Sequence, residues 1–371
     1  MVVTDPSTIP WIEKYRPQRL EDMTQSENLV NFFQNSITTG NISHYLFYGP
    51  PGTGKTSAIL AIGRELFKEH FSSRVIEFNA SDDRGINAVR DKITKVAKKS
   101  VSEIRLADGS CAPPYKIIIL DEADSLTEEA QDALRVIIEQ YSKVTRFCFI
   151  CNYISKITDA IKSRCAPVFF RKLSVQCVKQ KLKEIAKAES MDLPEPIIQA
   201  VIEISNGDMR KAIMLMQNLK YLYQYNSSMR KPFKDMTLEE LGRVSTLILG
   251  PKRNYDITDR DVHQIAASIS PATAHTIIKR IMDCRSIIKI SELSKEIIAW
   301  SYPIDTVLTQ INNAVLSTDL LDDEQKATII HYSGHIFLRM KECANEHIQL
   351  TDYMACIYGV NRGLSAYKPV Y

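Results

Sequence analysis

The chain contains the run Tyr45-Leu46-Phe47-Tyr48-Gly49-Pro50-Pro51-Gly52-Thr53-Gly54-Lys55-Thr56-Ser57. A short apolar segment here meets a glycine-rich turn, which predicts a buried strand followed by a phosphate-binding loop and a helix. Gly49, Gly52 and Gly54 permit a tight turn, so backbone N–H groups and the positive end of the helix can surround a phosphate. The complete GxxxxGK(S/T) spacing between a strand and a helix favours this interpretation over an ordinary glycine-rich turn.

Two polar side chains of the loop and two carboxylates further along the chain have the chemistry needed to bind and cleave a nucleotide phosphate. Lys55 would reach the β- and γ-phosphates of a nucleotide, and the Thr56 hydroxyl would ligate Mg²⁺. Residues 117–120 are branched and apolar, which predicts a parallel strand buried on both faces and ending at Asp121 and Glu122. There Asp121 would hold Mg²⁺ through its water shell, and Glu122 would orient or deprotonate the attacking water. This interpretation is favoured over a surface acidic cluster once the phosphate loop is accepted.

Strands and helices alternate from residue 44 to residue 170, which predicts an α/β fold with a parallel sheet and helices on both faces. Ligands bind at the carboxyl ends of the strands in such sheets. A strand over 145–150 is followed by Asn152, whose amide could bind the γ-phosphate or the attacking water, or could only cap the next turn. Both uses of Asn152 stay open at this point.

Composition excludes some classes of protein. The 371 residues can form two or three domains, and the formal charge of +3 is too small to imply a polyanionic partner. No apolar run approaches the ~20 residues of a membrane span, so no membrane association is expected. The eight cysteines are scattered, which is typical of buried thiols in a reducing compartment. Cys148 and Cys151 have CxxC spacing but lie within an apolar run, with no second pair to complete a zinc set.

Three segments have features whose structural or functional role the residues alone do not determine. Residues 10–17 carry Trp11 and Tyr15 between prolines, which fits an arm pinned on the core or a wall beside an adenine. Val136 lies off the apolar face of a helix predicted over 127–141, so a neighbouring element or a partner protein would have to cover it. A helix expected after Ser81 is basic on its outer faces, and this pattern alone favours a solvated surface. Its basic residues are Arg84, Arg90, Lys92, Lys95, Lys98 and Lys99.

The rest of the chain is predicted to be helical. Beyond Lys172 the apolar residues recur at helical spacing. Arg210 stands in the first turn of a helix, where its charge opposes the helix dipole, so a phosphate contact would explain it. We expect a nucleotide-binding domain at 1–171, a helical domain at 172–269 with an insertion near 224–256, and a further helical domain at 270–371 that serves packing or assembly.

Four segments together resemble a known family. They are Trp11-Ile12-Glu13-Lys14-Tyr15-Arg16-Pro17, Asn79-Ala80-Ser81-Asp82-Asp83-Arg84-Gly85-Ile86, Asp121-Glu122-Ala123-Asp124 and Ser163-Arg164-Cys165. These motifs are similar to those of AAA+ ATPases and, more narrowly, of the small subunits of replication factor C, the eukaryotic sliding-clamp loader. The resemblance is dense from residue 10 to about 215 and fainter afterwards. The loop over 100–114 is most like the subunit 2/4 type.

The resemblance implies a P-loop AAA+ domain that binds ATP and Mg²⁺ beneath a small helical lid. The residues implied at the nucleotide are Tyr15, Arg16, Gly49, Pro50, Pro51, Gly52, Thr53, Gly54, Lys55, Thr56, Ser57, Asn152 and Arg210. The residues implied in catalysis are Lys55, Asp121, Glu122, Asn152, Arg164 and Arg210, with Thr56 and Asp121 at the metal. Asn152 would be sensor 1 and Arg210 sensor 2, whereas Arg164 would be an arginine finger that enters the neighbouring subunit's site in trans.

The resemblance also implies macromolecular partners. Arg84, Arg90 and Lys92 would track the phosphates of a DNA strand without reading bases, which reverses the interpretation of that helix as a solvated face. The residues predicted to face the clamp are Val136, Gln140 and Tyr141. The helices from about residue 270 would form the collar of a heteropentamer with other replication factor C subunits. Its other partners would be the clamp PCNA and primer–template DNA, and its location the nucleus.

The predicted function is therefore that of an ATP-hydrolysing clamp-loader subunit, which helps to open a ring-shaped clamp and load it onto primer–template junctions in DNA replication and repair. Two alternatives remain. Asp121-Glu122-Ala123-Asp124 spells the DEAD-box helicase motif, although residues 230–371 contain no arginine motif of a second RecA-like domain. The other alternative is a non-catalytic nucleotide-binding scaffold of the same or an alternative loader, against which the complete set of Walker residues argues.

Overall fold

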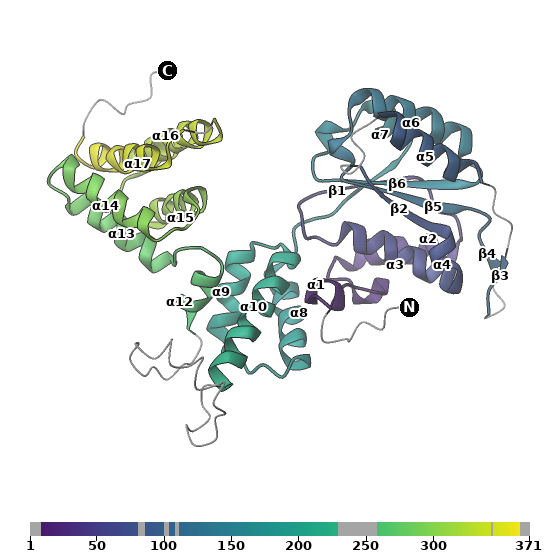
Figure 1. Cartoon of the computed structure of the whole chain (residues 1–371), viewed down its shortest axis with the longest axis horizontal. Coiled ribbons are helices and arrows are strands. Elements are labelled where there is room, and N and C mark those ends of the chain that lie inside the picture. The colour runs from purple at the N-terminus through teal and green to yellow at the C-terminus, as the bar shows by residue number, and fades with distance from the viewer. Residues whose placement is uncertain are drawn as a thin grey trace, which may run out of the picture. The chain divides into compact units, whose positions relative to one another are not determined.

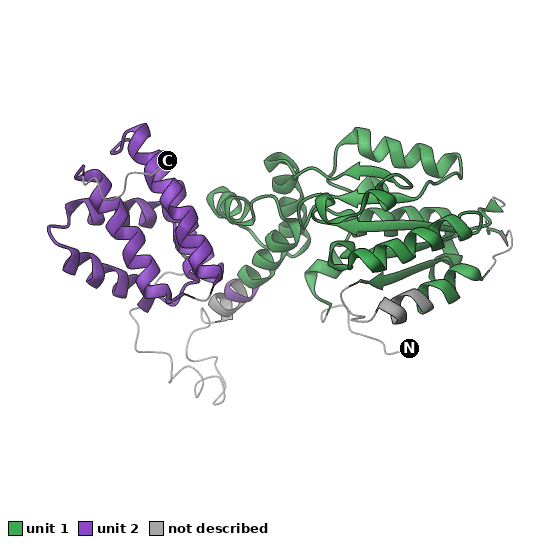
Figure 2. Ribbon diagram, turned by 90° about the horizontal axis from the view of Figure 1, so that it is seen from above, with its two compact units in different colours: residues 1–220 green, residues 221–371 purple. Residues whose placement is uncertain are grey.

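The structure is a computed structural model of the chain that describes residues 9–80, 86–99, 104–107, 111–228, 258–342 and 344–363. The chain divides into two compact units, residues 1–220 and residues 221–371 (Figure 2). The first holds a sheet with its covering helices and most of a three-helix segment. The second is helical throughout its described part.

Five parallel strands form the sheet of the first unit. Their spatial order is β2 (Val75–Asn79), β5 (Lys116–Asp121), β6 (Thr145–Cys151), β1 (Tyr45–Tyr48) and β7 (Ala166–Phe169). The central strands are buried on both faces, as the apolar run at 117–120 predicted. The predicted parallel sheet is therefore confirmed, and β1 lies at its interior rather than at an edge.

Alternate residues of the central strands enter two separate cores, because successive side chains in a strand point to opposite faces. On one face Ile117 and Ile119 pack with α2 (Glu27–Thr38) and α3 (Lys55–Phe67). On the other, Ile118 and Leu120 pack with helices that cover the opposite side of the sheet (Figure 1). Those helices are α5 (Ile86–Lys98), α6 (Glu128–Tyr141) and α7 (Asp159–Lys162).

Further helices complete the two units. In the first they are the short α1 (Trp11–Lys14) and α4 (Phe71–Arg74), the lid helices α8 (Val175–Ala188) and α9 (Glu195–Ser205), and α10 (Met209–Ser228) as far as residue 220. In the second they are α12 (Asp259–Ile265), α13 (Pro271–Asp283), α14 (Ile287–Ala299), α15 (Ile304–Ser317), α16 (Asp323–Lys341) and α17 (Glu346–Asn361). Ile277, Ile281, Leu308 and Ile311 share one buried core there, as their helical spacing predicted. None of the described helices is both long and apolar enough to cross a membrane.

Two segments differ from the expectation. Residues 100–114 were expected to be a loop, but the short strands β3 (Ile104–Arg105) and β4 (Cys111–Ala112) pair antiparallel within them. Strands of two residues are too short to show an alternating pattern. Residues 224–228, expected to begin an irregular insertion, instead continue α10, and most of that insertion lies outside the described residues.

The aromatic core under β1 gives a first prediction. Phe47 is fully buried, with its ring centroid 5.4 Å from that of Phe33 and 5.0 Å from that of Phe170. We expect Phe47→Ala to lower the free energy of unfolding of the first unit by about 3–5 kcal/mol, because it removes these contacts and leaves a cavity. Urea unfolding followed by circular dichroism measures the loss. Phe169→Ala on β7 is the matched control, since Phe169 is 49% exposed, and an equal loss in both variants would contradict the prediction.

Candidate nucleotide-binding site

The loop after β1 has a backbone that only glycine adopts without strain. Gly49, Gly52 and Gly54 have φ values of 139°, 68° and 89°. A Cβ atom on Gly49 would lie 2.2 Å from the carbonyl oxygen of Phe170, and one on Gly52 would lie 1.8 Å from Oδ1 of Asp208. The glycines thus let the loop lie directly against the end of β7 on one side and against the lid on the other.

Lys55 begins α3 and its ammonium is held inside the loop. Nζ donates to the carbonyl oxygens of Gly49 and Pro50 at 2.7 and 2.8 Å, and to Oδ1 of Asn152 at 3.0 Å. Burial and, to a lesser extent, the nearby charge of Arg210 lower the pKa of Lys55 to about 8. The site therefore holds a cation whose charged form an incoming anion would stabilise.

Thr56 and Asp121 bring two oxygen atoms together at the end of β5. The Thr56 hydroxyl donates to Oδ2 of Asp121 at 2.8 Å, and Oδ1 of Asp121 accepts from the backbone N–H of Glu122 at 2.8 Å. Glu122 has a φ of 55°, a left-handed conformation that turns the chain sharply after the strand. These groups, with Lys55 and Asn152, line a polar cavity of about 90 Å³.

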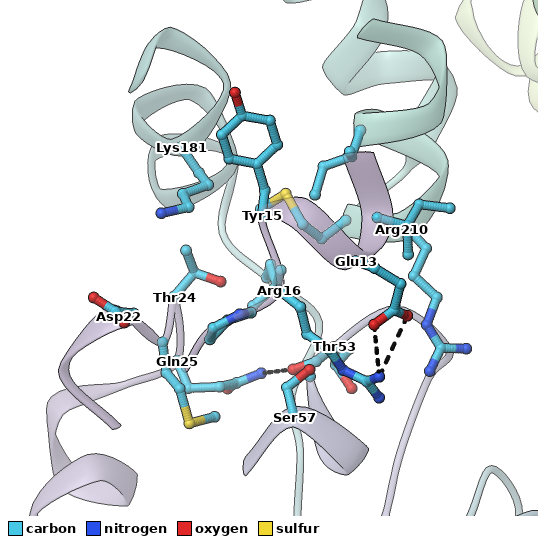
Figure 3. Close-up of a pocket in the computed structure, with 18 residues that line it drawn as sticks. Glu13, Tyr15, Arg16, Asp22, Thr24, Gln25, Thr53, Ser57, Lys181 and Arg210 are labelled. Carbon is cyan, nitrogen blue, oxygen red and sulfur yellow. Dashed lines mark hydrogen bonds and ion pairs between the residues drawn. The ribbon is translucent and has the colours of Figure 1, made fainter. Parts of the chain in front are cut away.

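A larger cavity of about 290 Å³ adjoins the first and is bounded by three parts of the chain (Figure 3). The segment around α1, here called the N-terminal arm (residues 10–17), forms one wall, the loop forms the floor and the lid forms the other wall. Its lining includes Ile12, Tyr15, Arg16, Pro17, Met23, Gln25, Thr53, Ser57, Leu173, Met209, Arg210 and Ile213. Residues 52–54 and Arg210 border both cavities, so together they suit the apolar base and the charged phosphates of one nucleotide.

The two predicted arm residues both line the larger cavity. In Figure 3 the Tyr15 ring points away from Thr53 and Ser57, whereas Arg16 extends towards them. The Tyr15 hydroxyl donates to Glu189 at 2.5 Å, and Arg16 pairs with Glu13 at 3.1 Å.

Several residues of this cavity had no signal in the sequence. Met23, Gln25, Leu173 and Ile213 belong to segments far apart in the chain and to no motif. The amide of Gln25 donates to the carbonyl oxygen of Thr53 at 2.7 Å, and this bond ties the loop to the segment before α2.

The remaining predicted residues lie outside both cavities. Arg164 follows α7 and donates through Nε to Oε1 of Glu139 at 2.6 Å, and through a terminal nitrogen to the carbonyl oxygen of Ala160 at 2.7 Å. On α6, Val136 is 50% exposed, Gln140 is exposed and Tyr141 is half-buried against the core.

The basic residues predicted to contact DNA are only partly described. Lys92 lies exposed on α5, and Arg90 lies on the same helix, with only its backbone described. Arg84 is outside the described residues.

Comparison with known proteins identifies the family. Residues 45–173 match the model for the ATPase family associated with various cellular activities (AAA), residues 180–220 the RCF1/5-like AAA+ ATPase lid domain, and residues 269–356 the replication factor C C-terminal domain. A putative replication factor C small subunit of Acanthamoeba polyphaga mimivirus is 59% identical, over 96% of this chain and 99% of that protein. The chain belongs to the replication factor C small subunits. Replication factor C subunit 2 of Oryza sativa subsp. japonica (39% identical, 94% and 93% covered) and subunit 4 of Homo sapiens (37% identical, 94% and 88% covered) are further relatives.

The predicted resemblance to the subunit 2/4 type is thus confirmed, and with it the AAA+ fold followed by a lid and an all-helical domain. As a replication factor C small subunit, the chain is a clamp-loader subunit of DNA replication that binds nucleotide and assembles with other replication factor C subunits. Family membership sets aside the helicase alternative.

The close contact at Gly52 predicts a specific loss of binding. Alanine at a φ of 68° costs roughly 1–2 kcal/mol, and its Cβ would displace Asp208 and the start of α10 from the loop. We expect Gly52→Ala to raise the Kd for ADP by about tenfold or more, equivalent to about 1.4 kcal/mol. Isothermal titration calorimetry measures this. Gly334→Ala is the control, because a Cβ there meets no atom within 4 Å, and a Gly52→Ala Kd within about twofold of wild type would refute the expectation.

The lowered pKa of Lys55 predicts a pH dependence. A bound phosphate favours the ammonium, so the pKa in the complex lies above the value of about 8 in the free chain, and binding takes up a proton above that pH. Nucleotide affinity should therefore fall as pH rises from about 8 to 10, by at most about tenfold per unit. Calorimetry in two buffers of different ionisation enthalpy detects the proton uptake. Lys55→Arg, whose charge persists, should bind more weakly but with little change over this range.

Proposed function

We propose that the chain hydrolyses ATP at this site and that hydrolysis is coupled to the loading of a sliding clamp onto primer–template DNA. The observation that supports this most is the meeting of five polar side chains from three strand ends and the lid around one small cavity. They are Lys55, Thr56, Asp121, Asn152 and Arg210, with Glu122 at its rim. Such a set suits a polyphosphate and the charge that moves during its cleavage.

Each of these residues would have a separate role in ATP hydrolysis. Lys55 would bind the β- and γ-phosphates, and Asn152, already hydrogen-bonded to Lys55, would bind the γ-phosphate or the attacking water. Glu122 would orient that water from the end of β5. Thr56 and Asp121 offer a hydroxyl and a carboxylate oxygen 2.8 Å apart, which are hard ligands of the kind that Mg²⁺ requires. The bound ion would neutralise charge on the phosphates.

Arg164 would act on a neighbouring subunit rather than on this site. It lines neither cavity, and its guanidinium lies at the surface in an ion pair with the half-exposed Glu139. An arginine supplied in trans stabilises the charge of the phosphoryl group in transfer, so ATP turnover would depend on assembly. The chain's own site would likewise need an arginine from another subunit.

The partners beyond the loader subunits are also proposed. The exposed Val136 and Gln140 on α6 would contact the clamp PCNA, whereas Tyr141 is half-buried and would contribute less. Arg84, Arg90 and Lys92 would follow the DNA phosphates from α5 and the segment before it. A nuclear location stays a prediction, since the mimivirus relative is a viral protein.

The proposal predicts that substituting a residue that acts in cis and one that acts in trans lowers ATP hydrolysis at different sites of the assembled loader. Glu122→Gln should leave ATP binding to this chain intact and lower hydrolysis at its own site by about 100-fold or more, whereas Arg164→Ala should do so at the neighbour's site. Single-turnover hydrolysis in the reconstituted complex, with clamp and primer–template DNA, measures both. Lys162→Ala removes a charge from the same surface and should change neither rate. Full hydrolysis and clamp loading by the Glu122→Gln complex would favour the non-catalytic scaffold.

A further inference from the structure

A single buried carboxylate joins the N-terminal arm to the lid. Glu189 ends α8, and its side chain is 6% exposed. Oε1 accepts hydrogen bonds from the Lys14 ammonium and from the Tyr15 hydroxyl, and Oε2 accepts one from the Lys220 ammonium. Lys14 and Tyr15 belong to the arm, whereas Lys220 belongs to α10. Three segments that are distant in the sequence thus meet at one side chain.

The three donors, Lys14, Tyr15 and Lys220, keep the Glu189 carboxylate ionised. Burial would raise the pKa of Glu189, but the hydrogen bonds from Lys14, Lys220 and Tyr15 outweigh burial and hold the pKa at about 2. If the arm left, the carboxylate would lose two of these three donors and only Lys220 would still pair with it. Two of the three hydrogen bonds to this carboxylate therefore hold the arm on the lid.

Trp11 provides a second attachment beside the first. Its backbone N–H donates to Oε1 of Gln217 at 3.1 Å, and its buried ring lies 5.4 Å from the Lys220 ammonium. Gln217 and Lys220 lie one turn apart on α10. The arm thus lies along the same helix whose first turn carries Arg210.

The same two elements form the walls of the nucleotide cavity. Ile12 and Arg16 line it from the arm, while Met209, Arg210 and Ile213 line it from α10. We infer that Glu189 is a positioning residue of the nucleotide site, which fixes the arm to the lid so that both walls and Arg210 are held in place over the loop. This inference rests on the proposed binding of the base between arm and lid.

The lid contains a matched control. Glu195, the first residue of α9, is also bonded by two lysines, Lys179 and Lys183 of α8. This second cluster joins two lid helices to each other, touches neither the arm nor the cavity, and leaves Glu195 half-exposed. Removing either carboxylate deletes ion pairs to two lysines, but only the loss of Glu189 should affect the nucleotide.

The test compares Glu189→Gln and Glu189→Ala with Glu195→Gln and Glu195→Ala in the full chain. The chain has two tryptophans, so in a Trp300→Phe background the emission of Trp11 reports the attachment of the arm. We expect both Glu189 variants to shift the Trp11 emission to longer wavelength and to raise the Kd for ADP, by about tenfold for alanine. The Glu195 variants should change neither. The effects of Lys220→Met and Glu189→Gln on the Kd should be less than additive, because both remove one interaction.

The outcomes separate this inference from the proposed function. Wild-type chain that fails to bind ADP would overturn the proposed nucleotide site. Wild-type binding with an unchanged Kd in folded Glu189→Gln would overturn the positioning role alone, whether or not the Trp11 emission moves. Equal weakening by the Glu195 variants would also overturn it, since the effect would then follow from lid stability. Circular dichroism establishes that each variant is folded.

Discussion

The candidate site depends on the parallel register of the sheet. In that register Tyr48 lies opposite Cys151, and Leu120 lies opposite Phe149, so β1, β5 and β6 end at the same edge. The polar residues that follow these strands are therefore gathered there, although Lys55 and Asn152 are 97 positions apart. A shift of one residue in register would move the side chains of a strand from the core on one face of the sheet into the core on the other, where they would not fit the packing. Burial of the apolar runs thus fixes both the core and the alignment of the site.

A second constraint joins this edge to the lid. Oδ1 of Asp208 accepts from the backbone N–H groups of Arg210 and Lys211 at 2.9 and 3.2 Å and so caps α10. The same oxygen occupies the space that a Cβ on Gly52 would need, and the N–H of Met209 donates to the carbonyl oxygen of Gly52 at 3.2 Å. This contact directs Arg210 into the phosphate cavity. There its charge opposes the helix dipole and disfavours the charge on Lys55, and a polyphosphate between them would offset both effects.

The sequence predicted those parts of the structure that are determined by residues close together in the chain. The loop, the buried run at 117–120 and the helical stripes of the second unit each have a pattern within a few residues. Glu189 had none, because it follows a charged helix and two of its partners are 175 and 174 positions away. In the structure Trp11 attaches the arm to the lid, while Tyr15 and Arg16 line the cavity, and the contact of the arm with an adenine stays a prediction. Pairing across such distances depends on the assembled fold and leaves no periodic signal.

The ion pair between Arg164 and Glu139 would keep Arg164 ordered and still available for the trans role proposed for it. Both side chains are partly exposed, and such surface pairs typically contribute about 0.2–1 kcal/mol. Hydrogen bonds from a guanidinium to phosphate are charge-assisted and often bidentate, and they are considerably stronger in a site from which water is excluded. A neighbour's nucleotide would therefore outcompete Glu139, while in the separate chain this pair restricts the rotamers of Arg164. In the proposed trans role, this weak contact would orient Arg164 before assembly and would let it move to the neighbour's site on assembly.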